Sequence, residues 1–254
     1  MRKNDAAEST KLAKLQKLTE RVIDCTRCPR LVHWRKEVAE RRPRSYLGQT
    51  YWSRPITGFG DPQSKLMIVG LAPAAHGGNR TGRIFTGDRS ASFLFQALWK
   101  LGLSSKPDSI APDDGVELFG CYLTAVVRCA PPANKPTRDE IANCREYLAE
   151  ELSILRPKAI VALGQIAWIG VLDTLQNLGF SGCRPRPKFS HGSRAFLSGP
   201  LSEGTLTLFG SYHPSQQNTF TGKLDQDMLV SILKEAAAEA GIGSRKAPGN
   251  GSIR

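Results

Sequence analysis

The sequence predicts one α/β domain with a central four-stranded, mainly parallel sheet flanked by helices. Short apolar runs recur along the chain, at 66–69, 121–127, 158–163 and 206–209. Segments in which apolar residues have helical spacing lie between and after them. The runs carry little polar interruption, which is typical of strands covered on both faces of a parallel sheet. A chain of 254 residues is long enough to bury one substantial core around them.

The first predicted helix precedes the sheet. Its apolar residues, at Leu12, Leu15, Leu18 and Val22, have helical spacing and place it over residues 10–23. We expect residues 1–9 to be disordered, residues 10–241 to form the domain, and residues 242–254 to be a flexible basic tail.

Two helices are marked by their end signals. Asp88 or Ser90 is placed to cap a helix whose apolar stripe runs from Phe93 to Leu101. Thr137 is followed three residues later by Glu140, the pattern of a capping box. Further helices are expected after Leu31, after Gly164 and from Leu224 to Ala240.

The charge balance favours a polyanionic partner. The chain carries 35 Lys and Arg against 23 Asp and Glu, a formal net charge of +12. Nucleic acid is the first expectation and an anionic membrane surface the second. No apolar run is long enough to span a bilayer, and the polar N-terminus lacks a signal-peptide core. We expect a cytoplasmic protein that acts as a monomer, with nucleic acid rather than a membrane as its partner.

A glycine-rich loop, residues 70–88, follows the first predicted strand. Small residues let backbone N–H groups approach a ligand closely, and His, Asn, Thr and Arg side chains add donors and acceptors. Loops this long without secondary structure usually have a function. Neither a P-loop nor a dinucleotide fingerprint is present, so the residue types leave phosphate, sugar or base open as ligand.

The carboxyl ends of the other strands carry polar segments as well. The segment 124–132 follows the second strand, and His213-Pro214-Ser215 follows the fourth. Because ligands of open α/β sheets bind beyond the carboxyl ends of the strands, these segments and the glycine-rich loop should meet at one edge.

Residues 41–60 form a predicted loop that is basic and aromatic. Arginines interleaved with Tyr46, Tyr51 and Trp52 suit a nucleic-acid strand, since cations meet phosphates and rings offer stacking surfaces. The alternative, that Tyr51 and Trp52 merely attach the loop to the core, is equally compatible with the sequence.

Four of the six cysteines have the layout of a thiolate site. Cys25 and Cys28 form a C-x-x-C pair, Cys129 lies in a loop, and Cys144 lies on a predicted helix. Four thiolates suit zinc or an iron–sulfur cluster, and spacing alone does not choose between them. Cys121 and Cys183 are expected to be ordinary thiols.

Taken together, these motifs resemble the uracil-DNA glycosylase superfamily, and most of all its family 5, the type B enzymes of bacteria and archaea. The resemblance is carried by residues 51–61, 70–88, 128–137 and 213–218 and by the cysteine tetrad. It covers residues 22–218 with gaps at 102–120 and 173–205. It implies a monofunctional glycosylase that acts on uracil in DNA and also accepts other deaminated bases such as hypoxanthine.

The resemblance also implies a cofactor and roles for particular residues. A 4Fe–4S cluster, structural rather than redox-active, is expected on Cys25, Cys28, Cys129 and Cys144, with zinc as the alternative. His213 is expected to donate to the departing base, with backbone N–H groups between Ala72 and Ala75 completing the anion site. The base should stack on Phe85, unless this is a core residue. The remaining expected contacts are Pro73, Ala74, Thr124 and Asn218 to substrate and Arg54, Arg80, Arg83, Gln216 and Gln217 to DNA.

Two positions depart from the pattern of other families in the superfamily. Where many relatives carry Asn or Asp to orient the attacking water, this chain has Ala72, and Asn79 is expected to hold the water instead. Where relatives often read the uracil edge with Asn, this chain has Ala125 after Thr124. Without that amide, discrimination between bases should loosen.

Two other functions remain alternatives at this point. A non-catalytic nucleic-acid-binding module with a structural four-cysteine metal site shares the charge and the tetrad but leaves His213 and the 70–88 loop unexplained. A small-molecule hydrolase on the same scaffold needs neither the net charge of +12 nor the arginine–aromatic loop.

Overall fold

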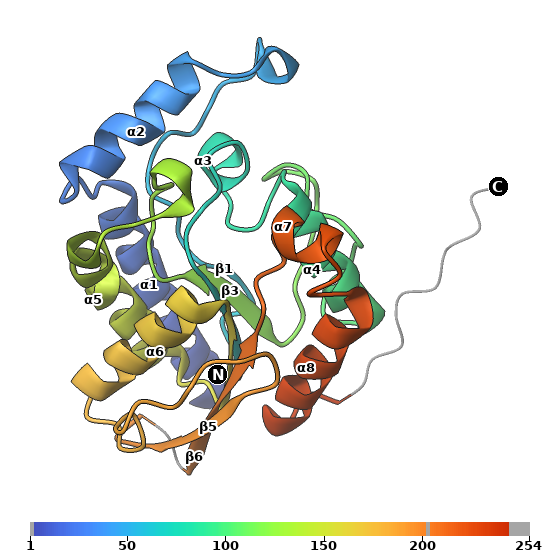
Figure 1. Ribbon diagram of the computed structural model, residues 1–254. Coiled ribbons are helices and arrows are strands. Elements are labelled where there is room, and N and C mark those ends of the chain that lie inside the picture. Colours follow the sequence, from blue (N-terminus) through green and yellow to red (C-terminus); the bar gives the residue numbers. More distant parts are fainter. Residues whose placement is uncertain (1–2, 202–203, 244–254) are drawn as a thin grey trace.

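The computed structural model describes residues 3–201 and 204–243, and its centre is one six-stranded sheet (Figure 1). The strand order is β1-β3-β2-β4-β6-β5. The strands are β1 (Phe59–Gly60), β2 (Leu66–Gly70), β3 (Cys121–Ala125), β4 (Ala159–Leu163), β5 (Arg194–Ser198) and β6 (Thr205–Ser211). The four inner strands, β3, β2, β4 and β6, are parallel and are the four predicted from sequence.

The two edge strands are antiparallel, and the sequence did not predict them. β1 pairs with β3, and β5 pairs with β6. In β5 burial alternates residue by residue, so that only Ala195 and Leu197 are buried. Such a half-buried edge strand gives a much fainter apolar signal than the fully buried inner strands. β1 has only two residues, too few for any periodicity.

Long helices cover the two faces of the sheet (Figure 1). Those on the sheet are α1 (Lys3–Ile23), α4 (Arg89–Lys100), α5 (Arg138–Leu155), α6 (Gln165–Asn177) and α8 (Gln226–Glu239), and a sixth long helix is α2 (Pro29–Glu40). One core joins α4 and α8 to a sheet face that includes Ile68, and the other joins α1, α5 and α6 to the face with Met67 and Val69. The sixth, α2, projects beyond the sheet.

The predicted helix caps are present. The Asp88 side chain accepts a hydrogen bond from the backbone N–H of Ala91 at the start of α4. Thr137 and Glu140 form the reciprocal bonds of a capping box at the start of α5. Both ends follow from local chemistry, in which a side-chain oxygen satisfies an N–H that has no partner within the helix.

One predicted boundary is corrected and another lies outside the described residues. α1 begins at Lys3, so the segment predicted to be disordered, 1–9, is helical from its third residue. Ala6, Ala7 and Glu8 are strong helix formers that extend the packed helix toward the N-terminus. The predicted tail lies outside the described residues from residue 244 onward, whereas Ile242 still packs on the core. Within the described ranges, no helix is both long and apolar enough to cross a membrane.

The carboxyl edge of the parallel strands carries the loops and four short helices, α3 (Gly78–Thr81), α7 (Gln216–Phe220), η1 (Arg44–Tyr46) and η2 (Pro132–Asn134). Pairing continues past the strand ends here. The N–H groups of Val126 and Val127 donate to the carbonyls of Gly70 and Leu71 at 3.0 Å each. The glycine-rich loop is therefore fixed against the segment that leads to Cys129.

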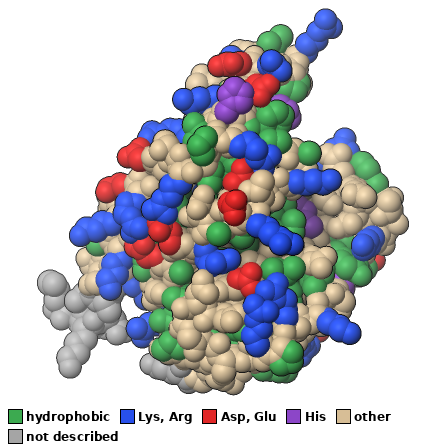
Figure 2. Space-filling view, turned by 60° about the vertical axis from the view of Figure 1, so that its left-hand side comes forward, with side chains coloured by type: hydrophobic (Ala, Val, Ile, Leu, Met, Phe, Trp, Pro, Cys, Tyr) green, Lys and Arg blue, Asp and Glu red, His purple; other side chains and the backbone are tan. Residues whose placement is uncertain are grey.

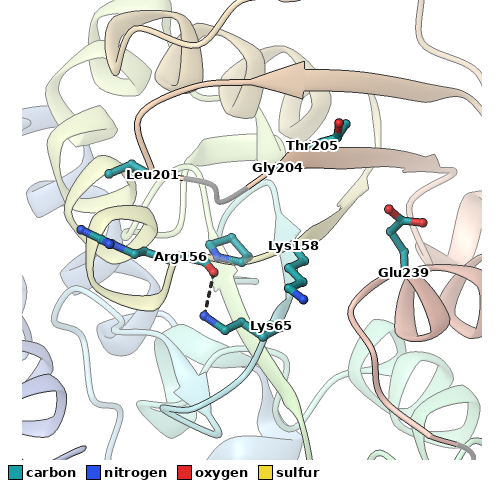
Figure 3. Close-up of a pocket in the computed structure, with 8 residues that line it drawn as sticks. Lys65, Arg156, Lys158, Leu201, Gly204, Thr205 and Glu239 are labelled. Carbon is teal, nitrogen blue, oxygen red and sulfur yellow. Dashed lines mark hydrogen bonds between the residues drawn. The ribbon is translucent and has the colours of Figure 1, made fainter. Parts of the chain in front are cut away.

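The opposite, amino edge carries a second hollow, which encloses about 520 Å³ (Figure 3). Lys65 and Lys158 stand just ahead of β2 and β4, and Arg156 directly follows α5. The ammonium group of Lys65 donates to the Arg156 carbonyl at 3.2 Å, and Glu239 of α8 lies on the facing wall.

Candidate functional site

A pocket of about 340 Å³ lies at the carboxyl edge of the sheet, where the sequence predicted a site. Four segments that are distant in sequence meet there. The lining residues are Leu71, Ala72, Pro73, Ala74, Ile84, Phe85, Asp88, Ser90, Ala133, Asn134, His213, Ser215 and Gln217. The structure therefore brings the first part of the glycine-rich loop together with His213, as predicted.

His213 is the titratable ring of this pocket. It directly follows the turn out of β6, and its Cβ lies 3.3 Å from where a Cβ on Gly164 would stand, so Gly164 leaves room for it. Its carbonyl accepts hydrogen bonds from Asn218 Nδ2 and the Ser215 N–H, both at 2.8 Å. Burial lowers the pKa of His213 to about 4, so the imidazole is neutral at physiological pH.

The backbone of residues 72–75 presents hydrogen-bond donors. Among the described residues, the N–H groups of Ala72, Ala74 and Ala75 donate to no protein acceptor. Ala72 and Ala74 line the pocket, so their N–H groups are available to a ligand there. Pro73 has no N–H, so it supplies only shape to the predicted anion site. The carbonyl of Ala74 faces away and accepts from Gly77 and Asn79.

Phe85 forms an apolar wall of the pocket and is buried. It adopts a left-handed backbone conformation with φ of 48°, which is uncommon for a bulky residue. Its ring packs on Gly70, where an added Cβ would come within 2.6 Å of Phe85 Cζ. The sequence left open whether Phe85 is a stacking surface for the base or a core residue. Its ring contacts the core and also lines the pocket, so both descriptions apply.

Among the polar residues of the pocket, Asp88 and Asn134 were not assigned to it from sequence. Asp88 was recognised only as a helix cap, yet its carboxylate also lines the pocket, and burial raises its pKa. Asn134 sits in η2 with a left-handed φ of 55°, after Ala133 with φ of 51°. Asn tolerates this conformation better than most residues, which is the one sequence signal that marks Asn134 within its proline-rich loop.

Asn79 is not placed to hold a water in the pocket, which corrects the sequence prediction. Its side chain is buried, and Nδ2 donates to the Arg35 carbonyl of α2 at 3.1 Å. Thr124 is also directed elsewhere. Its hydroxyl bonds to Glu151 Oε2 at 2.7 Å and accepts from the buried Arg128, so it is part of a network beneath the sheet's end rather than a substrate contact.

The three predicted DNA-binding arginines have different surroundings. Arg83 is buried and paired with both carboxylate oxygens of Asp114 at 2.7 Å, so it braces the loop and is not placed to contact DNA. Arg80 donates to His76, Gln49 and Gly87 and lies over the Tyr46 ring, so its donors already hold the loop. Only Arg54 is half-exposed, paired with Asp24 and stacked over Trp52.

The residues after His213 form α7. Gln216 and Gln217 are exposed, and Gln217 reaches the pocket lining. Asn218 was predicted to bind substrate. Its side-chain N–H instead donates to the backbone carbonyl of His213. At the far end of α7, the Phe220 ring is 70% exposed and lies under the guanidinium of Arg89.

The four predicted cysteine ligands lie in one region of the core. Cys28, Cys129 and Cys144 are buried in the same cluster, and Cys25 packs against it. Three of the sulfurs accept N–H groups: Cys129 from Arg35 at 3.1 Å, Cys144 from the Arg128 backbone at 3.4 Å, and Cys28 from Asn143 at 3.6 Å. Within the described residues no three His, Cys, Asp or Glu side chains are grouped as a site for a metal ion.

The chemistry around these sulfurs fits a thiolate-bound group. Burial raises the pKa of Cys129 to about 11 and that of Cys144 to about 12, so free thiols there would stay protonated. Metal coordination removes those protons, and N–H donors aimed at sulfur stabilise the resulting negative charge. Arg35 is buried against Cys129, and no carboxylate in the described part of the chain pairs with it.

The molecular surface is basic but mixed. In Figure 2, Lys and Arg side chains are spread over much of the face shown, with smaller groups of Asp and Glu between them. Arg41 and Arg44, in the segment that follows α2, are exposed.

Fold and site define an open α/β protein with a ligand pocket beyond the carboxyl ends of its parallel strands. The family described as the uracil DNA glycosylase superfamily matches residues 57–237. A type-5 uracil-DNA glycosylase of Pyrobaculum aerophilum is 48% identical over 87% of this chain and 91% of its own length. One from Thermus thermophilus is 48% identical over 86% and 94%. A type-4 enzyme of Pyrobaculum aerophilum is 33% identical over 85% and 92%. The chain thus belongs to the uracil DNA glycosylase superfamily, and within it to the type-5 group.

Proposed function

We propose that this protein is a monofunctional DNA glycosylase that excises uracil, and also hypoxanthine, leaving an abasic site for base excision repair. The observation that carries the proposal is a single pocket lined by a neutral His213, by Ala72 and Ala74 with unbonded backbone N–H groups, and by the apolar ring of Phe85. A flat base fits against Phe85, and its carbonyl oxygen finds donors opposite.

The leaving base is stabilised by donors that carry no net charge. When the N-glycosidic bond breaks, the electron pair goes to the base and positive charge develops on the sugar. His213 donates one hydrogen bond from a ring N–H, and Ala72 and Ala74 donate from the backbone. Neutral donors fixed in a partly buried site stabilise such an anion, and loss of one costs about 3–4 kcal/mol in the barrier.

Asp88 replaces Asn79 in the proposed mechanism as the residue that orients the attacking water. Its Oδ1 is held by the N–H of Ala91, which fixes the carboxylate while leaving acceptor capacity on the other oxygen. The raised pKa of Asp88 makes it a better proton acceptor than an ordinary aspartate. Asn134, which lines the same pocket, adds a neutral amide to the site.

DNA recognition is assigned to exposed residues around the pocket. Extruding the nucleotide costs a few kcal/mol of pairing and stacking energy, less at a mismatch such as U·G. Arg54 is the phosphate contact, while Gln216 and Gln217 at the start of α7 fill the space left in the duplex. The protein acts as a monomer on double-stranded and also single-stranded DNA.

The range of bases follows from what the pocket lacks. At the carboxyl end of β3 the chain has Ala125, and the Thr124 hydroxyl is occupied by Glu151. No side-chain amide from this strand therefore selects the uracil edge. The backbone N–H groups can donate to any base that has a carbonyl oxygen at the matching position. Hypoxanthine carries such a carbonyl.

The proposed cofactor is a 4Fe–4S cluster held by Cys25, Cys28, Cys129 and Cys144. The donor set and the N–H groups directed at three of the sulfurs support it. Such a cluster would join the segment before α2 to α5 and the loop after β3. It would supply cross-linking, while the residues of the pocket carry the reaction.

The test is a cleavage assay on duplexes with a single U·G, U·A or hypoxanthine·T pair, followed by alkali to cut abasic sites. His213→Ala, Asp88→Asn and the control His33→Ala, which changes an exposed histidine on α2, are assayed in parallel. We expect cleavage of all three duplexes, a loss of at least 100-fold for both pocket variants, and wild-type rates for the control.

Either of two results would overturn the proposal. Wild-type protein with intact metal content that cuts no duplex or single strand is not a glycosylase. Uracil-only cleavage would remove hypoxanthine from the proposal and point to a reader of the uracil edge elsewhere in the pocket.

A further inference from the structure

Arg35 has an unusual position for a buried arginine. The two other buried arginines, Arg83 and Arg128, pair with Asp114 and Glu151 at 2.7 and 2.6 Å. Arg35 is 4% exposed, its Nε has no hydrogen-bond partner, and its Nη1 donates to Cys129 Sγ at 3.1 Å. A guanidinium buried without a counter-charge is costly, so the negative charge must come from the cysteine sulfurs.

The main chain of the same residue reaches the other functional region. The Arg35 carbonyl accepts the side-chain N–H of Asn79, which is 1% exposed. The N–H of Asn79 donates to the carbonyl of Ala74 at 3.1 Å, and Ala74 lines the base pocket. Two hydrogen bonds therefore lead from the backbone of Arg35 to the pocket loop.

The position of Arg35 depends on how α2 is attached. The helix starts directly after Cys28, projects away from the sheet, and buries only Leu31, Arg35 and Val38 (Figure 1). Besides Cys28, its polar attachments to the body include Arg30, which grips Glu140 with bonds of 2.8 and 2.7 Å. The position of a helix held by so few contacts depends on the residues that attach it. Of these residues, Arg35 contacts both the cysteine region and the pocket loop.

We propose that Arg35 is a positioning residue that couples the cysteine site to the base pocket. Its guanidinium compensates the charge of the Cys129 sulfur, and its carbonyl holds Asn79 and, through it, the loop of residues 72–79. Metal binding at the cysteines fixes α2, and α2 fixes the backbone donors of the pocket. The proposal rests on the cysteine cofactor and glycosylase activity inferred above, but two of its three measurements do not need activity.

The experiment compares metal-loaded wild type with Arg35→Gln, Arg35→Lys and Asn79→Ala. The readouts are the rate of metal release to a chelator, amide hydrogen exchange over residues 72–82, and kcat and KM for a U·G duplex. Arg41→Gln is the matched control for metal release and exchange, because Arg41 directly follows the same helix and pairs with Glu37 at the exposed surface.

For Arg35→Gln we expect at least fivefold faster metal release, tenfold faster exchange over 72–82, and a higher KM with a smaller change in kcat. Arg35→Lys keeps the charge and should restore most of the metal retention. Asn79→Ala should raise exchange over 72–82 by a similar factor while metal release stays at the wild-type rate. Arg41→Gln should leave metal release and exchange over 72–82 at the wild-type rates.

The coupling is refuted if Arg35→Gln accelerates metal release but leaves exchange over 72–82 unchanged, or if Asn79→Ala leaves that exchange unchanged. It is also refuted if Arg35→Gln and Arg41→Gln release metal equally slowly. If Arg35→Gln does not fold, Arg35→Lys and Asn79→Ala carry the test. Lack of glycosylase activity in wild type would remove only the kinetic readout, so the two proposals fail separately.

Discussion

The two hollows at opposite edges of the sheet differ in what surrounds their polar groups. The amino-edge hollow is larger and more basic, but two of its three cations, Arg156 and Lys158, are exposed. The carboxyl-edge pocket carries one half-buried imidazole, one half-buried carboxylate and unbonded backbone donors beside the apolar ring of Phe85. Fixed and desolvated polar groups, rather than the number of charges, distinguish a site that can do chemistry.

Substitution of one residue at each edge gives the largest contrast. His213→Ala should lower kcat/KM for a U·G duplex by about 10²–10³-fold, because one fixed donor to the departing base is lost. Lys158→Ala should stay within about twofold of wild type at physiological salt, since an exposed cation acts through screened, long-range attraction. Equal losses for both variants would contradict the assignment of the reaction to the carboxyl-edge pocket.

The apolar wall of the carboxyl-edge pocket can be altered through Gly70. Gly70→Ala brings a Cβ to 2.6 Å from the Phe85 ring, which has to move. We expect a loss of about 1–3 kcal/mol in the free energy of unfolding, as for other overpacked core sites, together with reduced activity. Urea unfolding measures the first effect. Gly243→Ala, where an added Cβ meets nothing within 4 Å, is the control and should cost nothing.

The burial of His213 predicts a pH dependence. Its pKa is near 6.5 in the unfolded chain and about 4 in the folded protein, so the unfolded state takes up the proton first as pH falls. This contribution to stability is intact above pH 6.5 and is lost as pH falls through 6.5 toward 4. Urea midpoints of wild type should therefore decline more than those of His213→Gln across that interval, and parallel declines would contradict the assigned burial.

The smallest expected effect concerns the stability contribution of the amino-edge cations. Lys65 donates to the Arg156 carbonyl, and Lys158 is exposed. Lys158→Ala should change the free energy of unfolding by no more than about 0.5 kcal/mol, as for most surface substitutions. A much larger change would show that this hollow is an organised site rather than a charged surface.

The sequence was sufficient for features that depend on local chemistry or continuous burial. The four inner strands are apolar on both faces, so each is visible in the sequence as an apolar run. Asp88 and Thr137 cap their helices by accepting hydrogen bonds from neighbouring backbone N–H groups. Because parallel strands bring their carboxyl ends to one edge, the meeting of His213 with the glycine-rich loop could be predicted as well.

The direction in which each loop side chain points could not be predicted. Asn79 and Arg83 have residue types that suit a nucleic-acid site, but their partners are Arg35 and Asp114, 44 and 31 residues away in sequence. Asp88 was assigned one role because a cap uses one carboxylate oxygen, and sequence does not show what the other faces. Such assignments depend on tertiary contacts, which residue type and spacing do not encode.

The arrangement of the cysteines sets an order for assembly of the nascent chain. Arg35 is synthesised 94 residues before Cys129, and Cys28 is synthesised 115 residues before Asn143, which donates to its sulfur. While the ribosome makes the intervening segment, Arg35 lacks its contact with Cys129 and Cys28 lacks its contact with Asn143. Those contacts form only after α5 has emerged, so the proposed cofactor can be loaded only once Cys144 has been synthesised.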